Sequence, residues 1–218
     1  MKQILQYLFN HNMLSKAEAK SILLEIAQNK FNENEVTAFV SVFLMRTITL
    51  EELEGFREAL LRLAVPVELG TGDLVDIVGT GGDGKDTFNI STLASFVVAG
   101  TGQKVAKHGN YGVSTVSGSS NVLEELGYQF KTNSEDLQKD IEKGNICFLH
   151  APLFHPALRS VAPLRRGLGL RTFFNVLGPL VNPAKPKYSV IGVYRFAFAR
   201  ISQSLLQPNG VMFLLVHA

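Results

Sequence analysis

A glycine-rich segment has the residue types and spacing of a phosphate-binding turn. Residues 79–84 read Gly-Thr-Gly-Gly-Asp-Gly and follow the strand-like run Leu74–Val78. Glycines let backbone N–H groups approach an anion closely, because no Cβ atom stands in the way. Residues 89–92, Asn-Ile-Ser-Thr, then open an apolar helical segment. A helix N-terminus with two hydroxyls is a second site for phosphate, and Ser91 is placed to reach a magnesium ion carried on it.

Two known nucleotide-binding motifs match the residue pattern of this turn, but the residues that follow the turn fit neither motif. Residues 79–84 satisfy G-x-G-x-x-G, yet the dinucleotide motif needs an acidic residue about 20 positions on, and residues 100–104 contain none. The P-loop motif needs Ser or Thr after Lys85, where Asp86 stands instead. The segment is therefore a phosphate turn of another kind, or a tight turn followed by an ordinary helix cap.

A second polar turn, Lys107-His108-Gly109-Asn110, follows the strand-like run Gln103–Ala106. A basic pair, a glycine and an amide at the carboxyl end of a strand suit an anionic or amide-bearing ligand. The hydroxyl-rich residues 114–120 then lead into a helix and offer another N-terminus for phosphate. A lone histidine is usually structural, but this setting favours a functional one.

In order and spacing, these segments resemble the anthranilate phosphoribosyltransferases of tryptophan biosynthesis. A further similar block runs from Arg165-Arg166 through Arg171–Leu180 to Asn182-Pro183, so the resemblance covers nearly the whole chain. It implies a pentosyltransferase, in the glycosyltransferase class. The enzyme would transfer the phosphoribosyl group of 5-phosphoribosyl-1-pyrophosphate (PRPP) to anthranilate with Mg²⁺, giving N-(5-phosphoribosyl)anthranilate and pyrophosphate.

The resemblance also implies roles for individual residues. Lys107, His108 and Arg165 would be catalytic, and Ser91 would be a magnesium ligand. Arg165 would pair with the anthranilate carboxylate through its forked donors. The PRPP contacts would be Gly79, Gly82, Asp83, Thr87, Asn89, Ile90, Ser91, Thr92, Lys107, His108, Gly109, Asn110, Thr115 and Ser119. The anthranilate contacts would be Gly79, Asn110, Ala151, His155 and Arg165.

The implied chemistry is attack of the anthranilate amine on C1 of the ribose as pyrophosphate leaves. Charge builds on the pyrophosphate oxygens, so backbone donors, Lys107 and magnesium would supply most of the catalysis. The aromatic amine is neutral at pH 7 and needs no strong base, so a proton-accepting role for His108 is a hypothesis. From the residues alone, Arg165 is also compatible with a surface charge, and His155 with a helix cap before Pro156.

The elements that position these residues change character near residue 70. Residues 1 to about 65 predict four amphipathic helices, with capping boxes starting at Ser15 and Thr49 and a third helix capped by Asn32 or Asn34. Further on, strands alternate with helices, which predicts a mostly parallel sheet covered on both faces. Strand-like runs lie at 74–78, 103–106, 146–149, 188–194 and 211–217, and helical segments at 91–99, 121–126, 134–143 and 198–206.

The predicted fold class is α/β, with two domains. Residues 1–70 form a small all-helical domain, with a returning segment near 163–186, and residues 71–218 form a PRPP-binding α/β domain. The resemblance implies a further segment with an Asp-Glu pair that binds magnesium. Because the chain ends at Ala218, we expect a truncated domain with weak or absent activity.

Composition narrows the class of protein. Hydrophobic residues make up 46% of the 218 residues and charged residues 18%, which predicts a packed core. The net charge of +2 does not argue for nucleic acid. The single cysteine, Cys147, lies in an apolar run and predicts a buried thiol in a reducing compartment. No apolar stretch reaches ~18 residues, so we expect no membrane span. A cytoplasmic homodimer that forms through the helical domain, with small-molecule substrates, is expected.

Two residues depart from the family pattern, and two alternatives stay open. Asn121 stands in place of an expected aspartate, and Tyr111 in place of an arginine. The alternatives are a pyrimidine nucleoside phosphorylase-like enzyme and a non-catalytic nucleic-acid-binding relative of the same fold. The Lys107–Asn110 block and Arg165 favour anthranilate over the phosphorylase. The net charge of +2, with only modest Arg/Lys clustering at residues 159–171, argues against the nucleic-acid-binding relative.

Overall fold

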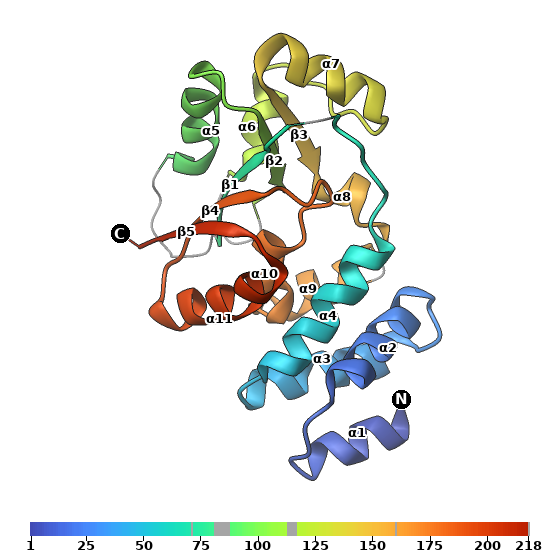
Figure 1. Ribbon diagram of the computed structural model, residues 1–218. Coiled ribbons are helices and arrows are strands. Elements are labelled where there is room, and N and C mark those ends of the chain that lie inside the picture. The colour runs from blue at the N-terminus through green and yellow to red at the C-terminus, as the bar shows by residue number, and fades with distance from the viewer. Residues whose placement is uncertain (71, 81–87, 113–116, 160, 218) are drawn as a thin grey trace. The chain divides into compact units, whose positions relative to one another are not determined.

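The chain divides into two compact units. The computed structural model describes residues 1–70, 72–80, 88–112, 117–159 and 161–217 (Figure 1). One unit comprises Met1–Ala64 and His155–Val181, and the other comprises Val65–Phe154 and Asn182–Ala218. Among the described helices, none has the length and apolar character needed to cross a membrane.

The first unit is helical, as expected. Its N-terminal part contains α1 (Lys2–Phe9), α2 (Lys16–Ala27), α3 (Glu33–Met45) and α4 (Leu50–Leu63). Capping boxes open α2, α3 and α4 at Ser15, Asn32 and Thr49, where each side chain accepts a hydrogen bond from the backbone N–H three residues on. The later segment adds η1 (Pro156–Leu158), α9 (Ala162–Leu168), α10 (Phe173–Leu177) and η2 (Gly178–Leu180).

An aromatic cluster joins the later segment to the bundle. Phe173 stacks on Phe56 with ring centroids 4.5 Å apart, and it meets Phe43 edge-on at 5.3 Å. Arg57, which is buried on α4, donates from Nε to the Leu180 carbonyl oxygen at 2.9 Å. Two stretches of chain separated by about ninety residues of the other unit therefore share one core.

A buried carboxylate ties the loops of the bundle together. Glu52 is fully buried and accepts hydrogen bonds from the backbone N–H groups of Leu14, at 3.0 Å, and Thr49, at 2.9 Å. It also forms an ion pair with Arg46. Burial raises the pKa of the Glu52 carboxyl, but the hydrogen bonds from Arg46, Thr49 and Leu14 outweigh burial and hold the pKa below its usual value.

The second unit is built on a parallel sheet of five strands, as the alternation of segments predicts. The strands are β1 (Val75–Gly79), β2 (Val105–Gly109), β3 (Ile146–His150), β4 (Tyr188–Gly192) and β5 (Met212–Val216). Their order across the sheet is β3-β2-β1-β4-β5 (Figure 1). The helical elements are α5 (Ile90–Gly100), α6 (Ser119–Glu125), α7 (Ser134–Gly144), α8 (Ala151–Phe154), α11 (Phe196–Leu206) and η3 (Gln207–Asn209).

Alternation of side chains along the strands produces a core on each face of the sheet. On one face, Val75, Ile77 and Val105 pack against Ala99 of α5. On the other, Leu74, Ala106, Cys147 and Leu149 pack with Leu137 and Ile141 of α7. Successive residues of a strand point to opposite faces, so odd and even positions of β1 and β2 separate cleanly. Cys147 is buried, as predicted, and burial raises the pKa of its thiol to about 12, which disfavours the reactive thiolate.

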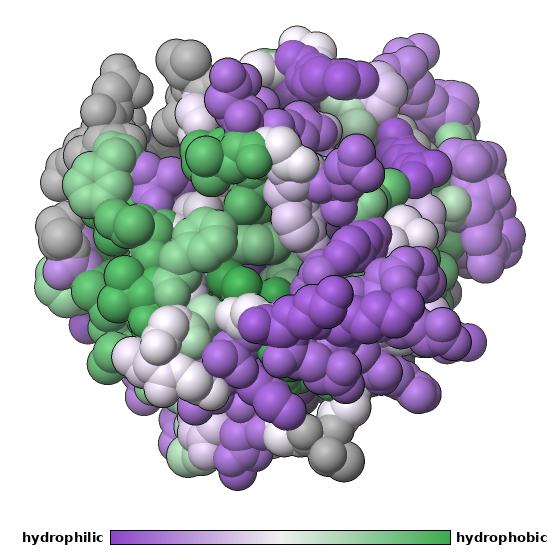
Figure 2. Space-filling view, turned by 90° about the horizontal axis from the view of Figure 1, so that it is seen from above, coloured by the Kyte–Doolittle hydropathy of each residue, from purple (hydrophilic) through white to green (hydrophobic). Residues whose placement is uncertain are grey.

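The sheet is not covered on both faces throughout. Figure 2 shows a hydrophobic area on one face of the molecule. The exposed apolar side chains of the second unit include Leu93 and Val97 on α5, and Met212, Leu214 and Val216 on β5. Among the described residues, β5 pairs with β4 alone and leaves one face of alternating side chains open. Both faces are covered at the centre of the sheet, as predicted, whereas β5 exposes apolar side chains on one face.

The strand that carries the basic pair is longer than its sequence suggests. β2 runs to Gly109, so Lys107 and His108 lie within the strand and are buried, with 2% and 4% exposure. The expected turn after Ala106 is wrong, because the parallel register with β3 continues to the pair Gly109↔His150. The polar residues that follow the strand begin at Asn110.

Replacing Glu52 by Gln tests the buried carboxylate. We expect a loss of about 3 kcal/mol in the free energy of unfolding at pH 7, because Arg46 keeps a buried charge without its partner. The folded-state pKa of Glu52 lies below its unfolded value, so this stability is present above the unfolded pKa and is lost as pH falls through the folded one. Urea unfolding of both proteins between pH 3 and pH 7 measures it. The exposed neighbour Glu51, changed to Gln, should cost little, and an equal loss in both variants would contradict the assignment.

Candidate functional site

The glycine-rich turn begins at the point where the order of strands reverses. β2 and β3 lie on one side of β1, and β4 and β5 lie on the other. Gly79 and Gly192 are register partners at the carboxyl ends of β1 and β4. The backbone N–H and the hydroxyl of Thr80 both donate to the Gly192 carbonyl oxygen, at 2.9 and 3.1 Å. In open parallel sheets, ligands bind at such a reversal, outside the carboxyl ends of the strands.

The first turn of α5 presents ordered hydroxyls beside this edge. Asn89 is the N-cap residue, and its Oδ1 accepts from the Thr92 hydroxyl at 2.9 Å and the Ser91 hydroxyl at 3.4 Å. Thr92 is buried, whereas the Ile90 side chain is 58% exposed. These hydroxyls and the helix dipole form a polar, positively biased end of α5.

A buried ammonium group lies between β1 and this helix end. Lys107 Nζ donates to the Ile77 carbonyl oxygen at 2.6 Å and lies 3.4 Å from Ser91 Oγ. Burial lowers the pKa of Lys107 to about 8, and the nearby carboxylate of Asp76 opposes that shift. Within the part of the chain that the structure describes, no carboxylate makes an ion-pair contact with this ammonium group. A cation held in this way is suited to an anionic ligand.

Close backbone approach joins the end of β2 to the start of α6. A Cβ atom on Gly109 would lie 2.2 Å from Ser119 Oγ, and one on Gly118 would lie 2.2 Å from the backbone nitrogen of Gly112. The Asn110 carbonyl oxygen accepts from the Ser119 hydroxyl at 3.3 Å and from the Ser120 N–H at 3.2 Å. Backbone atoms exclude a Cβ atom at position 118, and at position 109 the Ser119 side chain would have to shift, so both glycines serve the packing of the turn against the helix.

The two departures from the family pattern have structural partners. Asn121 Oδ1 accepts from the N–H groups of Gly112, at 3.0 Å, and Gly118, at 2.9 Å. Tyr111 donates its hydroxyl to Glu124 at 2.6 Å. An amide oxygen meets both backbone donors, so Asn121 closes the turn without the charge of an aspartate.

His150 belongs to this edge of the sheet, although the sequence analysis did not select it. Its Nδ1 lies 2.8 Å from Ser120 Oγ, and the Phe130 ring stacks on the imidazole at 4.4 Å. It is 5% exposed, and burial lowers its pKa. The position of His150 at the carboxyl end of a predicted strand was the available signal, but its partners Ser120 and Phe130 lie 30 and 20 residues away.

The structure gathers part of the predicted site. Within the second unit it brings together Lys107 with Ser91 and Asn89, and Gly109 with Asn110 and Ser119. Ala151 follows His150 and opens α8. Gly82, Asp83, Thr87 and Thr115 lie outside the described residues, so their roles stay predictions.

Arg165 and His155 belong to the first unit. The Arg165 guanidinium lies over the Phe174 ring at 5.4 Å and donates to Asn175 Oδ1 at 3.5 Å, and burial lowers its pKa. The Arg165 side chain is therefore held against α10 by these two contacts, unlike a fully solvated surface arginine. His155 is 1% exposed, with Nε2 2.8 Å from the Val181 carbonyl oxygen.

Comparison with known proteins places this architecture in a family. Residues 71–217 match the glycosyl transferase family model for an a/b domain, and residues 2–64 match the model for its helical bundle domain. The chain belongs to this glycosyl transferase family. Anthranilate phosphoribosyltransferases of Flavobacterium johnsoniae and Cytophaga hutchinsonii are 53% and 56% identical to it over 218 residues, which confirms the resemblance seen in the motifs. The match covers 100% of this chain and 66% of each relative.

Solved structures of the family have the same fold. Anthranilate phosphoribosyltransferase from Thermus thermophilus matches with a TM-score of 0.90 and 36% identity, over 98% of this chain and 65% of that one. The enzyme from Saccharomyces cerevisiae in complex with PRPP and Mg matches with a TM-score of 0.83 and 32% identity, over 93% of this chain and 61% of that one.

The oxygen donors near Lys107 fit a metal that arrives with a phosphate ligand. The described residues contain no cluster of three or more His, Cys, Asp or Glu side chains that could hold a metal ion. Ser91 Oγ and Asn89 Oδ1 lie 3.4 Å apart at the start of α5. Magnesium keeps several water ligands and is commonly bound through few protein oxygens plus substrate phosphates. Ser91 Oγ and Asn89 Oδ1 are suited to this mode of coordination.

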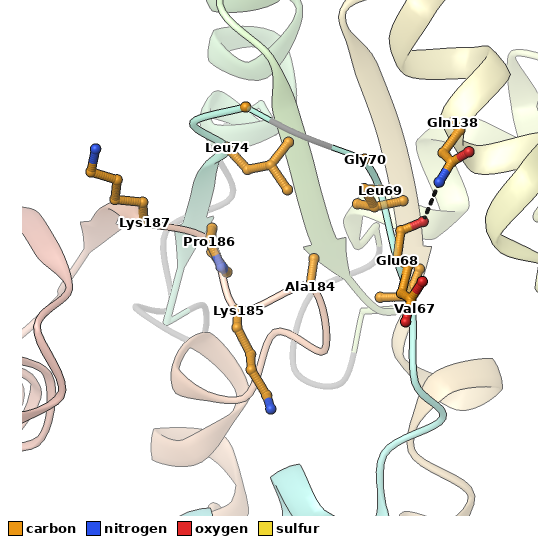
Figure 3. Close-up of a pocket in the computed structure, with 11 residues that line it drawn as sticks. Val67, Glu68, Leu69, Gly70, Leu74, Gln138, Ala184, Lys185, Pro186 and Lys187 are labelled. Carbon is orange, nitrogen blue, oxygen red and sulfur yellow. Dashed lines mark hydrogen bonds between the residues drawn. The ribbon is translucent and has the colours of Figure 1, made fainter.

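An open pocket of about 490 Å³ lies away from this site (Figure 3). Leu74 and Lys187, which precede β1 and β4, line it together with Leu69 and Gln138. Figure 3 shows the Gln138 amide donating to the Glu68 carbonyl oxygen, at 2.9 Å. The pocket therefore lies at the amino ends of the strands and contains none of the predicted site residues.

Proposed function

We propose that this protein transfers the phosphoribosyl group of PRPP to anthranilate, as an anthranilate phosphoribosyltransferase of tryptophan biosynthesis. The observation that carries the proposal is the buried Lys107 ammonium between β1 and the polar start of α5. The 53–56% identity to enzymes of that name supports it. Those relatives and the solved structures favour this activity over the nucleoside phosphorylase and nucleic-acid alternatives.

Each part of the site has a task in that reaction. Lys107 and the N–H groups at the start of α5 stabilise the negative charge that grows on departing pyrophosphate. The start of α6, with Ser119, binds the 5-phosphate, and Asn110 contacts anthranilate. Ser91 Oγ would be one ligand of a magnesium ion that arrives with PRPP, and that ion would neutralise part of the pyrophosphate charge. The proton-accepting role of His108 and the cytoplasmic location stay predictions.

The two-domain division follows from the same proposal. Residues 1–70, with the returning segment near 163–186, form the helical domain, and residues 71–218 form the PRPP-binding domain. The placement of Arg165 against Phe174 and Asn175 supports its assignment to the anthranilate carboxylate, because a guanidinium braced on one side keeps its forked donors oriented.

Titration with PRPP tests the function. We expect calorimetry of the 218-residue chain to show PRPP binding that strengthens with Mg²⁺. Lys107→Met should weaken it at least about tenfold, since a charge-assisted contact is lost while the apolar stem stays buried. Ser91→Ala should remove most of the Mg²⁺ effect. The exposed Lys139, changed to Met, is the matched control and should bind normally.

Two results would argue against this function. One is PRPP affinity that Lys107→Met leaves unchanged. The other is phosphorolysis of thymidine or uridine by the chain, which would support the nucleoside phosphorylase alternative. Salt-dependent binding of DNA would support the alternative of a non-catalytic nucleic-acid-binding protein.

Neighbouring arginines provide a test of the anthranilate site. Arg165→Gln should weaken anthranilate binding about tenfold or more, because one bidentate ion pair is lost, and should leave PRPP affinity unchanged. Arg166→Gln, at the exposed neighbouring position, should change neither. Fluorescence titration with anthranilate measures both variants, and equal affinities would count against Arg165.

We also propose that the helical unit forms a homodimer. Its exposed apolar side chains support this, among them Phe9 at 60% and Met45 at 89% exposure. Sedimentation velocity should show a dimer that the double variant Phe9→Glu with Met45→Glu converts to monomer. A wild-type protein that stays monomeric at all concentrations would contradict the proposal.

A further inference from the structure

The pairing of β1 with β2 differs from the pairing of the other strands. The registers of β1 with β4, β2 with β3 and β4 with β5 each contain five residue pairs. The register of β1 with β2 contains one, Val75↔Val105, at the amino ends of the two strands. A parallel ladder would normally continue along both strands. Here it ends before the residues that lead to the site.

Side chains take the place of the missing ladder. Asp76 Oδ1 accepts from the backbone N–H of His108 at 3.2 Å. Asn182 Nδ2 donates to Asp76 Oδ2 and to the Ala106 carbonyl oxygen, both at 2.9 Å. From the opposite face, Lys107 Nζ satisfies the Ile77 carbonyl oxygen. Buried backbone groups must find partners, and these three side chains satisfy the His108 N–H and the carbonyl oxygens of Ala106 and Ile77 where the ladder is interrupted.

The arrangement is rigid and costly. Asp76 is 1% exposed and Asn182 is 5% exposed. Asn182 is itself fixed, because its Oδ1 accepts from the Ala184 N–H at 2.9 Å. Burial raises the pKa of Asp76 to about 6, although Lys107, Asn182 and the backbone N–H groups of His108 and Ile77 act against that shift. A regular ladder flanked by apolar side chains would avoid the cost of desolvating these groups. Stability alone therefore does not explain the presence of the buried polar network.

We propose that Asp76 and Asn182 are positioning residues that hold the carboxyl ends of β1 and β2 apart. The gap sets the spacing between Gly79–Thr80 and the segment Lys107–Asn110, and the pyrophosphate group of PRPP binds there. The inference rests on the proposed function. Neither residue touches the ligand in this scheme; each acts through the backbone of β2 and through Lys107.

Variants of both residues, titrated with inorganic pyrophosphate and with PRPP, test the proposal. Asp76→Asn keeps one acceptor oxygen and Asp76→Ala keeps none, so affinity should fall in the order wild type, Asn, Ala, with about tenfold or more lost at the last step. Asn182→Ala removes the bridge to Ala106 and should also weaken binding about tenfold. Amide hydrogen exchange at His108 should accelerate in the Asp76→Ala variant, since its acceptor is gone.

Glu52→Gln provides the matched control, because it also neutralises a fully buried, hydrogen-bonded carboxylate, but in the other unit. It should lower stability and leave pyrophosphate affinity unchanged. Wild-type affinity in Asn182→Ala and in a folded Asp76 variant would overturn the inference, as would an equal loss of affinity in Glu52→Gln. If the Asp76 variants do not fold, Asn182→Ala alone decides. If the wild-type chain binds neither pyrophosphate nor PRPP, the proposed function itself fails and the inference fails with it.

Discussion

Five register pairs join β1 to β4, from Val75↔Tyr188 to Gly79↔Gly192, and the order of the sheet reverses between these two strands. This pairing places Gly79, where the glycine-rich segment begins, at the reversal, and in open parallel sheets ligands bind beside the strand ends at such a point. It also sets α5 against one face of the central strands, so the start of that helix meets the same edge. The pairing of β1 with β4 therefore determines the position of most candidate ligand-binding groups in the second unit.

The edge so formed concentrates buried polar groups in an otherwise apolar sheet. Lys107 and Asp76 come from neighbouring strands and are nearly inaccessible to solvent. Burial lowers the pKa of Lys107 and raises the pKa of Asp76, and both shifts favour the neutral form of the side chain. Desolvation of this kind is tolerated where hydrogen bonds compensate it, and Ile77, His108 and Asn182 supply those bonds. Groups with strongly shifted pKa values cluster at functional sites, which agrees with the assignment of the candidate site to this edge.

A second set of contacts governs the start of α6. The start of the helix packs so closely against the end of β2 that backbone atoms exclude a Cβ atom at position 118, and one at position 109 would displace the Ser119 side chain. His150 fixes the first turn through Ser120, and Asn121 closes the preceding loop by accepting from two backbone donors. The substitution of Asn for the expected aspartate therefore preserves the geometry of the turn while removing a negative charge beside a predicted phosphate site.

Local patterns in the sequence determined the elements: capping boxes at Ser15 and Thr49 marked helix starts, and alternating apolar runs marked the strands, because these signals depend on neighbours within a few residues. The glycine-rich turn, Ser91 and Lys107 were also evident, since their residue types carry the chemistry. Tertiary structure alone decided that β2 continues through His108, that β5 keeps an open face, and that Asn182 meets Asp76 across 106 residues of chain. The reason is physical. A backbone group that loses its partner in the ladder can form a hydrogen bond with any polar side chain that the fold brings within reach, and the spacing of residues along the sequence does not determine which side chain that is.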